Sequence, residues 1–264
     1  LFAHSNDYQQ EWIQEIKNLN RDDLFQNLEK KDMKKLYGFA SDGLLVKKGG
    51  YLFPKLICQE MTTHPNIKII FNHCFHKWSK REGKLDVEFL NQKRKSDFDD
   101  LIIANGPSLE EILSGLKISK GQLVGLKGEQ SIDLDLPLNS AGYILPKINN
   151  ITWIGSSHEK EYEDLDICYD VGKDLVQRID KNFKIKLAGT SNMLMEARLR
   201  TGSKDRLPLA GKIEENVYAL GALGSRGFSL GPILGEYIAS LINNSPSPIS
   251  AGIALAIEPL RFKD

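Results

Sequence analysis

The residues with the clearest potential for chemistry lie in two turns, each of which follows an apolar stretch. Residues 101–104 end at Asn105-Gly106, and residues 217–220 end at the glycine-rich segment 221–227. Glycine lets the backbone approach a ligand closely and adopt dihedral angles that other residues avoid. A strand, such a turn and a helix together aim backbone N–H groups and the positive end of the helix dipole at one point, which suits an anionic ligand. The segment 221–227 therefore predicts a ligand site, although glycine-rich turns also join strands to helices that bind nothing.

Other chemical motifs are weak or absent. The segment His73-Cys74-Phe75-His76 suggests a metal site, but on a strand its two histidines face opposite sides. No second Cys/His pair stands at zinc spacing, so we expect no metal. The sequence has no GxSxG, P-loop or HExxH motif, and the glycines of 221–227 are spaced GxxGxxG rather than GxGxxG.

The composition excludes some classes of protein. The chain has 264 residues, in which 35 Lys+Arg balance 35 Asp+Glu. That balance argues against a polybasic nucleic-acid binder but leaves room for a local basic patch. No apolar run reaches the ~20 residues that span a membrane, so we expect no membrane association. Three cysteines without CxxC spacing favour the reducing cytosol.

Charged runs are interpreted as solvated surface. The lysine-rich run 30–35 fits an exposed helix face, with RNA contact as the alternative. The same interpretation applies to the other charged clusters, which are Lys77, Lys80 and Arg81, the run 93–95, and Glu159, Glu161, Glu163 and Asp164.

Hydrophobic periodicity predicts the elements that position these residues. Helices are expected at 8–19 (Trp12, Ile13, Ile16 and Leu19 on one face), at 22–30 (Leu24, Phe25 and Leu28 inward), from Pro54 to about Thr63, around 165–180, and from Pro232 onward with Ile233, Leu234, Tyr237, Ile238, Leu241 and Ile242 inward. Strands are expected at 67–71, 85–89, 100–106 (covered on both faces), 122–130, 142–148, 151–157, 192–200 and 217–220, with a tight hairpin at Asn149-Asn150.

Four segments, taken in order, resemble the FAD-dependent oxidoreductases of the D-amino-acid oxidase and glycine oxidase type. They are 49–54 (Gly-Gly-Tyr-Leu-Phe-Pro), 98–106, the hairpin residues 142–147 with 154–157, and 199–208 leading to 222–228 (Ala-Leu-Gly-Ser-Arg-Gly-Phe). With the tail 246–262, the match is closest to the oxidase half of bifunctional tRNA 5-methylaminomethyl-2-thiouridine biosynthesis proteins. Residues from Leu199 onward are its most specific part.

The resemblance implies an α/β fold with α+β elements in two parts. One part is a Rossmann-like FAD-binding domain that lacks its first βαβ unit, formed by 49–115 and 204–264. The other is a substrate domain with an antiparallel sheet, formed by 1–48 and 116–203. Residues 101–106 and 217–228 should then converge in one sheet. The family's opening βαβ unit with GxGxxG is missing here, and the chain opens on Leu1-Phe2-Ala3-His4. We therefore expect a piece of a longer protein, with that unit upstream and tight FAD binding only in the longer form.

The implied reaction is oxidation of a secondary amine on tRNA. The carboxymethylaminomethyl group of a wobble uridine would lose a hydride to flavin, hydrolyse as the imine and release glyoxylate, leaving the aminomethyl form, with oxygen as the final oxidant. A methyltransferase half is expected only as part of the longer relatives.

The resemblance also assigns roles to residues. Arg200 would bind the substrate carboxylate, Tyr143 would line the pocket, and Arg226 would stabilise charge near the flavin or contact the substrate. The FAD-binding residues would be Gly50, Ala104, Asn105, Gly106, Gly224, Ser225, Arg226, Gly227 and Phe228. The structural alternatives are an ion pair for Arg200, a solvated loop charge for Arg226 and a core position for Tyr143.

Two other functions remain open from the sequence. The first is an oxidase of a free amino acid or small secondary amine on the same fold, which needs a lid where tRNA needs a wide, basic entrance. The second is a non-catalytic binding fragment, which a flavin spectrum of the longer protein would test. The oligomeric state and the identity of the tRNA are not given by the sequence.

Overall fold

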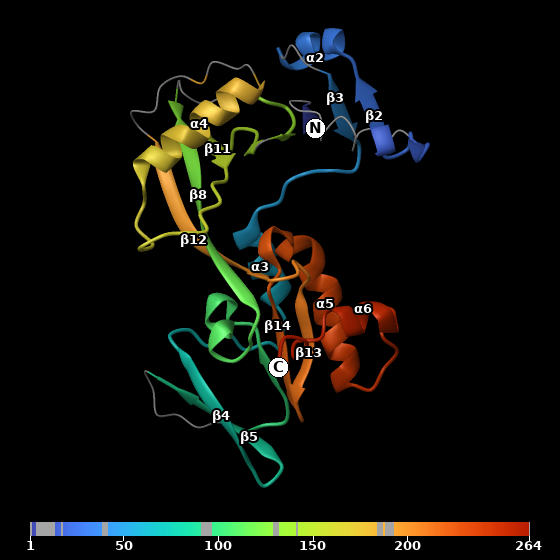
Figure 1. The fold of residues 1–264 in the computed structure, drawn as a ribbon, viewed down its shortest axis with the longest axis vertical. Coiled ribbons are helices and arrows are strands. Elements are labelled where there is room, and N and C mark those ends of the chain that lie inside the picture. Colours follow the sequence, from blue (N-terminus) through green and yellow to red (C-terminus); the bar gives the residue numbers. More distant parts are fainter. Residues whose placement is uncertain are drawn as a thin grey trace. The chain divides into compact units, whose positions relative to one another are not determined.

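The computed structural model describes residues 2–3, 14–16, 18–38, 42–90, 97–128, 132–140, 142–183, 187 and 193–263. The chain forms two compact units (Figure 1). Unit 1 consists of Leu1–Cys58 and Lys120–Arg198, and unit 2 consists of Gln59–Ser119 and Leu199–Asp264.

Unit 1 is built on a mainly antiparallel sheet with the strand order β12-β8-β11-β10-β9-β1-β3-β2. Its neighbours β8 and β11, β11 and β10, and β10 and β9 all pair antiparallel. The two long strands, β8 and β12, continue into unit 2. The strands are β1 (Phe2–Ala3), β2 (Phe25–Leu28), β3 (Gly43–Val46), β8 (Leu116–Lys127), β9 (Leu138–Asn139), β10 (Tyr143–Ile144), β11 (Ile151–Gly155) and β12 (Leu194–Ser203).

The predicted hairpin at Asn149-Asn150 is confirmed. Both asparagines have positive φ, at 50° and 61°, as the favoured two-residue hairpin turn requires. Ile148 and Ile151 close the turn by exchanging two backbone hydrogen bonds of 2.9 Å. Asparagine tolerates this conformation better than most residues, so the sequence signal had a direct steric basis.

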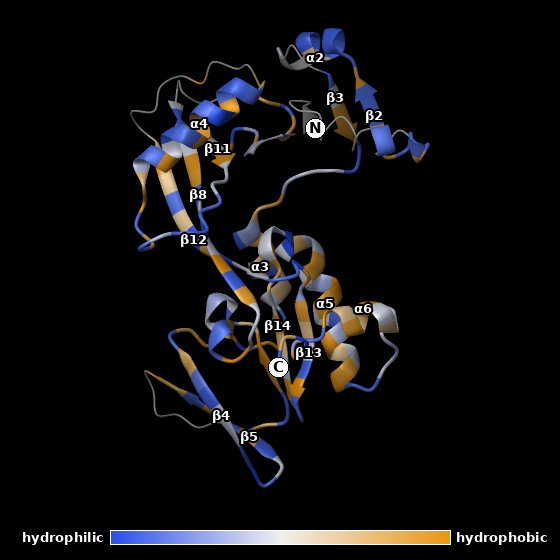
Figure 2. Ribbon diagram, in the orientation of Figure 1, coloured by the Kyte–Doolittle hydropathy of each residue, from blue (hydrophilic) through white to orange (hydrophobic). Residues whose placement is uncertain are grey.

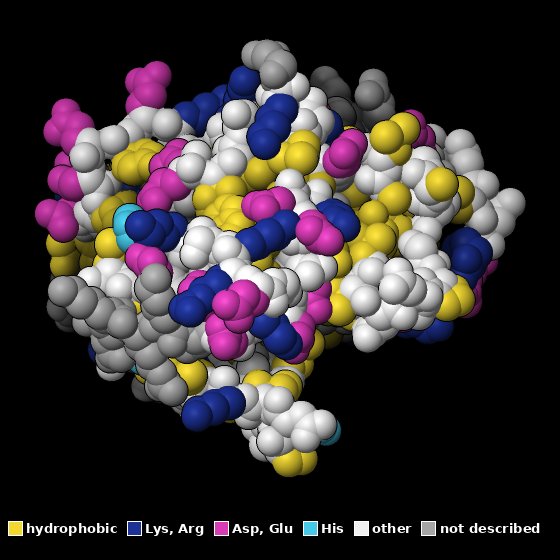
Figure 3. Space-filling view, turned by 90° about the horizontal axis from the view of Figure 1, so that it is seen from below, with side chains coloured by type: hydrophobic (Ala, Val, Ile, Leu, Met, Phe, Trp, Pro, Cys, Tyr) yellow, Lys and Arg dark blue, Asp and Glu magenta, His cyan; other side chains and the backbone are white. Residues whose placement is uncertain are grey.

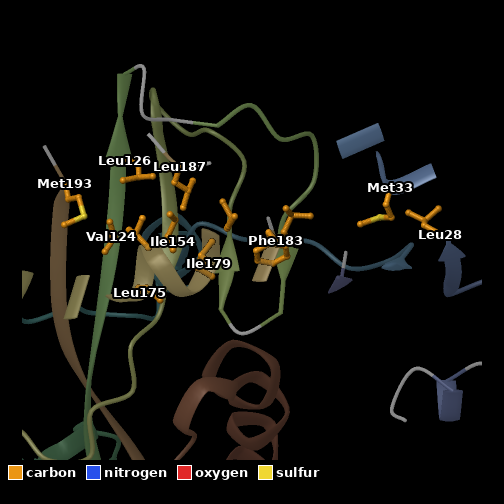
Figure 4. Packing of buried hydrophobic residues seen from close by; sticks show 13 residues of the cluster. Leu28, Met33, Val124, Leu126, Ile154, Leu175, Ile179, Phe183, Leu187 and Met193 are labelled. Atoms are coloured by element: carbon orange, nitrogen blue, oxygen red, sulfur yellow. The ribbon is translucent and has the colours of Figure 1, made fainter. Parts of the chain in front are cut away.

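The core of unit 1 lies between this sheet and helix α4 (Tyr169–Phe183). Figure 4 shows Val124 and Ile154 on the sheet pointing toward Leu175 and Ile179 on the helix, and all four are less than 3% exposed. The helix begins four residues later than predicted, and Leu165 is 53% exposed in the preceding loop. The apolar spacing thus extends one turn beyond the N-terminus of the helix itself.

A polar network joins the two ends of the loop between β11 and α4. The fully buried Gln122 side chain donates to both carboxylate oxygens of Glu159, at 3.1 and 3.2 Å, and accepts from the Cys168 backbone N–H at 2.9 Å. The Ser157 hydroxyl donates to Glu159 at 2.6 Å. Buried polar groups that keep their partners rigidify a structure, so this network fixes both ends of the loop.

Replacing Gln122 by leucine is expected to lower the free energy of unfolding by about 2–3 kcal/mol, because it leaves the Cys168 N–H and the Glu159 carboxylate without their amide partner. Urea unfolding measures the loss, and amide exchange should speed up at Cys168. The control is Gln26→Leu on an exposed strand position, which should change stability by less than about 0.5 kcal/mol. Equal effects of the two substitutions would contradict the assigned role.

The expected helix at 22–30 is wrong. Phe25–Leu28 form β2, which pairs antiparallel with β3, and a helix α2 (Lys30–Tyr37) follows. Apolar residues at positions i and i+3 favour a helix, but over so short a segment this signal is weak, and pairing with β3 decides the structure. The lysines of α2 are exposed while Met33 is buried, which confirms the solvated-face interpretation. Most of the helix expected at 8–19 lies outside the described residues.

Unit 2 confirms the predicted convergence of the two ligand-site segments. Strands β13 (Leu209–Glu214), β14 (Val217–Gly221) and β7 (Leu101–Ile103) form one sheet in that order. β14 and β7 are parallel, with Ala219 opposite Ile103, although more than a hundred residues separate them. Parallel pairing brings both carboxyl ends to the same edge of the sheet.

A second sheet, two α-helices and 3-10 turns also belong to unit 2. Strands β4 (Phe75–Arg81), β5 (Lys84–Phe89) and β6 (Asp97–Phe98) are antiparallel. The remaining helical elements are α5 (Gly227–Ile242), α6 (Ala251–Ala256) and a 3-10 turn at Gly106–Glu111. Helix α3 (Pro54–Thr62), which the division between the units at Cys58 crosses, begins at Pro54 as predicted. Figure 2 shows that α5 is largely hydrophobic and α2 hydrophilic.

The β4–β5 hairpin is tied to the turn after β13. The Trp78 indole donates to Glu214 at 3.1 Å, and the Lys80 ammonium forms ion pairs of 3.1 Å with Glu214 and Glu215. Leu85 and Val87 are buried as predicted, but Asp86 between them is buried too, so the burial along β5 does not alternate. Lys80 is therefore a structural residue, and the run 93–95 lies outside the described residues.

Three further expectations for unit 2 are wrong. Residues 67–71 form no strand, and Ile67, Ile69, Ile70 and Phe71 are 46–76% exposed. Strand β7 is not covered on both faces, because Ile102 is 48% exposed. Helix α5 begins at Gly227 rather than Pro232, which lies inside it, and Ile233 faces outward at 36% exposure. In each case the apolar spacing predicted burial of side chains that the described residues leave exposed.

Candidate functional site

The candidate site of unit 2 lies where β7 and β14 end side by side. The segment Ala104–Gly106 follows β7, and the segment Ala222–Gly227 follows β14 and leads into α5. The predicted ligand-site segments are therefore adjacent turns on one sheet edge. This is the position at which open α/β sheets bind ligands.

The glycines of these turns leave open space. Gly106 and Gly224 have φ values of +64° and +56°, in the region that disfavours side chains. Apart from its own chain neighbours and the backbone of its own helix, a Cβ built on Gly106, Gly224 or Gly227 would have no atom of the described residues within 4 Å. The conformation explains glycine at 106 and 224, whereas nothing in the described structure requires it at Gly227.

Two buried polar atoms of unit 2, one in the first of these turns and one on β12, lack partners. Among the described residues, Asn105 Oδ1 and Thr201 Oγ1 are buried without a hydrogen bond. A buried unpaired oxygen costs about 1–3 kcal/mol, so each is a position where a bound group would gain a contact. Asn105 was predicted from its place after the strand. Thr201 was missed, because a threonine on a strand carries no distinguishing signal.

Arg226 stands at the N-terminus of α5. Its guanidinium donates to the backbone carbonyl of Arg206, and its own carbonyl accepts from the Ser229 hydroxyl at 3.0 Å. The fixed charge adds to the positive end of the helix dipole, so this corner of unit 2 favours an anion. Ser225 and Phe228 are exposed beside it.

Arg200 lies in the same unit as these turns. It is half-buried on β12, between half-buried Leu199 and buried Thr201. β12 runs directly into the turn 203–208, whose Arg206 carbonyl holds Arg226. The structure thus links the strand of Arg200 to the glycine-rich turn, which the sequence did not reveal.

The turn 203–208 is itself held by an ion pair. Arg261 contacts Asp205 through two hydrogen bonds, Nε to Oδ2 at 2.8 Å and Nη2 to Oδ1 at 2.9 Å. The Ser203 hydroxyl donates to Asp205 Oδ1 at 2.7 Å, and the Leu207 N–H donates to it at 2.9 Å. The Arg261 guanidinium, then these two donors, hold the pKa of Asp205 well below its ordinary range.

Stability should therefore depend on Asp205 at acidic pH. A carboxyl whose pKa is lower in the folded than in the unfolded state stabilises the fold above its ordinary pKa of 3.8, and this contribution disappears as the pH falls further. The difference in unfolding free energy between the protein and Asp205→Asn should be constant above about pH 5 and shrink below it. Urea unfolding across pH measures it, and a constant difference down to about pH 2 would contradict the assignment.

Tyr143 and Gly50 lie in unit 1. The Tyr143 ring packs against the backbone of its partner Gly155, where a Cβ would stand 2.2 Å from the ring. Gly50 is exposed in the segment before α3. Their assignment to the pocket and the cofactor stays a prediction.

The described residues contain no group of three or more His, Cys, Asp or Glu placed to hold a metal ion. The His73 ring nitrogen Nδ1 lies 2.8 Å from the Phe71 carbonyl. In the part of the chain that the structure describes, no helix combines the length and the apolar character needed to cross a membrane. Figure 3 shows apolar side chains at the surface between charged ones.

Comparison with known proteins gives one family. Residues 1–241 match the DAO family, described as FAD dependent oxidoreductase. The tRNA 5-methylaminomethyl-2-thiouridine biosynthesis bifunctional protein MnmC of Campylobacter jejuni is 29% identical over 258 residues, covering 86% of this chain and 41% of that protein. The protein of the same name from Idiomarina loihiensis is 25% identical, covering 85% and 38%. The chain thus spans about two fifths of these curated relatives.

Solved structures share the fold. Glycine oxidase from Geobacillus kaustophilus superposes with a TM-score of 0.81 at 14% identity, over all of this chain and 74% of that one. Iminodiacetate oxidase from Chelativorans sp. BNC1 gives 0.79 at 13% identity, over 98% and 74%. The mixed α/β architecture with antiparallel sheets is therefore that of glycine oxidase-type enzymes.

Proposed function

We propose that this chain, which belongs to the FAD-dependent oxidoreductase family, carries most of an oxidase that acts on tRNA. The substrate is the carboxymethylaminomethyl group of a wobble uridine, and the product is the aminomethyl form. The tRNA-biosynthesis names of relatives that match 85–86% of the chain support this substrate. A cytoplasmic location follows from the same proposal.

The observation that carries the proposal is the paired turns at the ends of β7 and β14. The unpaired Asn105 oxygen and the open space over Gly106, Gly224 and Gly227 fit the flavin cofactor of the family. The chemistry that FAD supplies when bound is acceptance of a hydride from the carbon beside the substrate nitrogen. The α5 N-terminus and Arg226 supply the positive charge that its anionic groups need.

Arg200 has the chemistry of a carboxylate anchor. A guanidinium offers two parallel donors to a carboxylate and stays charged at all physiological pH. Its half-buried position on β12 strengthens such a pair relative to one in open water. We assign it to the carboxymethyl arm, and Tyr143 to the wall of the substrate pocket.

The cofactor site needs a further βαβ unit. β7 is an edge strand of its described sheet, and Ile102 on it is exposed. Parallel strands are normally covered on both faces. We assign this surface to a GxGxxG-bearing unit from outside this sequence, in line with the match to only 74% of each of the two fold neighbours. A methyltransferase half in the longer protein likewise stays a prediction.

The test uses the intact protein with FAD and tRNA that carries carboxymethylaminomethyl-uridine. Nucleoside analysis should show that nucleoside disappearing, the aminomethyl nucleoside appearing, and one glyoxylate released per conversion. Glycine, sarcosine and iminodiacetate serve as competing substrates. Oxidation of one of these with unchanged tRNA would establish the small-amine oxidase instead. A colourless, inactive intact protein would leave only the non-catalytic alternative.

A further inference from the structure

Arg261, near the end of the chain, uses every donor of its guanidinium. Besides the two bonds to Asp205, Nη1 donates to the carbonyls of Pro208 at 3.1 Å and Glu258 at 2.9 Å, and Nη2 donates to that of Leu207 at 3.2 Å. The side chain is only 13% exposed. A fully used planar fork fixes the orientation of all its acceptors, which a lysine ammonium does not.

The acceptors of Arg261 belong to two segments, the turn 203–208 and its own segment 258–261. The turn 203–208 connects Arg261 to Arg226 through a series of hydrogen bonds. Asp205 fixes the turn through Ser203 and Leu207. Between them, Arg206 adopts a positive φ of 65°, and its carbonyl accepts from the Arg226 guanidinium.

The tail that carries Arg261 is anchored independently. The Ile257 carbonyl accepts from the Ala210 N–H at 3.0 Å, and Leu260 and Phe262 pack on the core of unit 2. Gly115, with φ +80°, lies directly beneath the Phe262 ring, so that a Cβ there would stand 2.2 Å from it. Replacing Arg261 by lysine should therefore loosen the turn 203–208 without detaching the segment 257–262.

We propose that Arg261 is a positioning residue: through the turn 203–208 it holds the Arg206 carbonyl in place, and so fixes Arg226 at the N-terminus of α5. Its effect on the cofactor rests on the proposed function, whereas its effect on the helix end does not. The tail of the chain thereby controls a charge at the candidate site without touching a ligand.

The first test is amide hydrogen exchange on the intact protein and its Arg261→Lys variant. Exchange should rise about 10-fold both in 203–208 and in 224–228, because the second segment depends on the first. Strand β14 serves as the internal reference. The matched control is Arg206→Lys, since the carbonyl of that residue, and not its side chain, carries the contact. A rise confined to 203–208 would overturn the proposal.

The second test is a double-mutant cycle on FAD affinity. Arg261→Lys and Arg226→Lys should each raise the FAD dissociation constant about 10-fold, and the double variant should be little worse than either. The effects of Arg261→Lys and Asn105→Ala on the FAD dissociation constant should instead multiply in the double variant. Additive effects of Arg261 and Arg226 would overturn the proposal. Exchange that rises in both segments with unchanged FAD affinity would support Arg261 as a positioning residue and contradict the cofactor site.

Should Arg261→Lys fail to fold, Asp205→Asn carries the same two tests. It keeps the Oδ1 acceptor used by Ser203 and Leu207 and removes the charge that Arg261 needs. Faster exchange in 224–228 supports the proposal there too, and unchanged exchange overturns it.

Discussion

Replacing Arg200 by lysine in the intact protein should lower kcat/KM for carboxymethylaminomethyl-tRNA by roughly 30-fold or more and leave the flavin spectrum normal. Loss of a charged anchor costs about 2–5 kcal/mol, because an ammonium does not reproduce the two parallel bonds of a guanidinium. Nucleoside analysis of tRNA incubated with each enzyme measures the effect as accumulation of the carboxymethylaminomethyl nucleoside.

Arg198 provides the matched control on the same strand. It is exposed, and its ion pair with Glu196 is long, at 3.9 Å. Arg198→Lys should therefore leave kcat/KM within about twofold. If Arg200→Lys clears the nucleoside as fast as the unchanged protein, Arg200 is structural, and the carboxylate-binding role passes to Arg226.

Local patterns predicted several turns, one helix start and some buried positions of the fold well. The Asn149-Asn150 hairpin, the start of α3 at Pro54 and the buried Leu85 and Val87 all follow from steric preferences or alternation that act within a few residues. The adjacency of β7 and β14 came from the family resemblance rather than from periodicity. It is confirmed by their parallel pairing.

Several of the errors occur where distant pairing decides the structure. Phe25–Leu28 became a strand because β3 pairs with it, and residues 67–71 have no described strand to pair with. The Asp205–Arg261 contact joins residues 56 positions apart, and neither has a pattern that marks its partner. Thr201 was missed for a similar reason, since burial without a partner is a property of the folded chain alone.

Substituting Gly227 by leucine should separate cofactor binding from folding. Gly227 has ordinary helical dihedrals, with φ −53°, and a Cβ there meets no described protein atom within 4 Å. The fold should therefore accept the side chain, and a helix gains from losing glycine. A cofactor that approaches the backbone at this point would instead meet the leucine. A crowding cost of about 1–3 kcal/mol raises the FAD dissociation constant roughly 5- to 150-fold.

The control for Gly227 is Gly252→Ala in α6. Gly252 also lies in a helix of unit 2, and a Cβ at this position would likewise have no described protein atom within 4 Å, but it is far along the chain from both turns. The substitution should raise stability by up to about 1 kcal/mol and leave FAD affinity unchanged. Equilibrium titration with FAD and urea unfolding give both quantities for each variant. If Gly227→Leu leaves the FAD affinity unchanged, FAD does not approach the backbone at Gly227, and the cofactor site lies elsewhere.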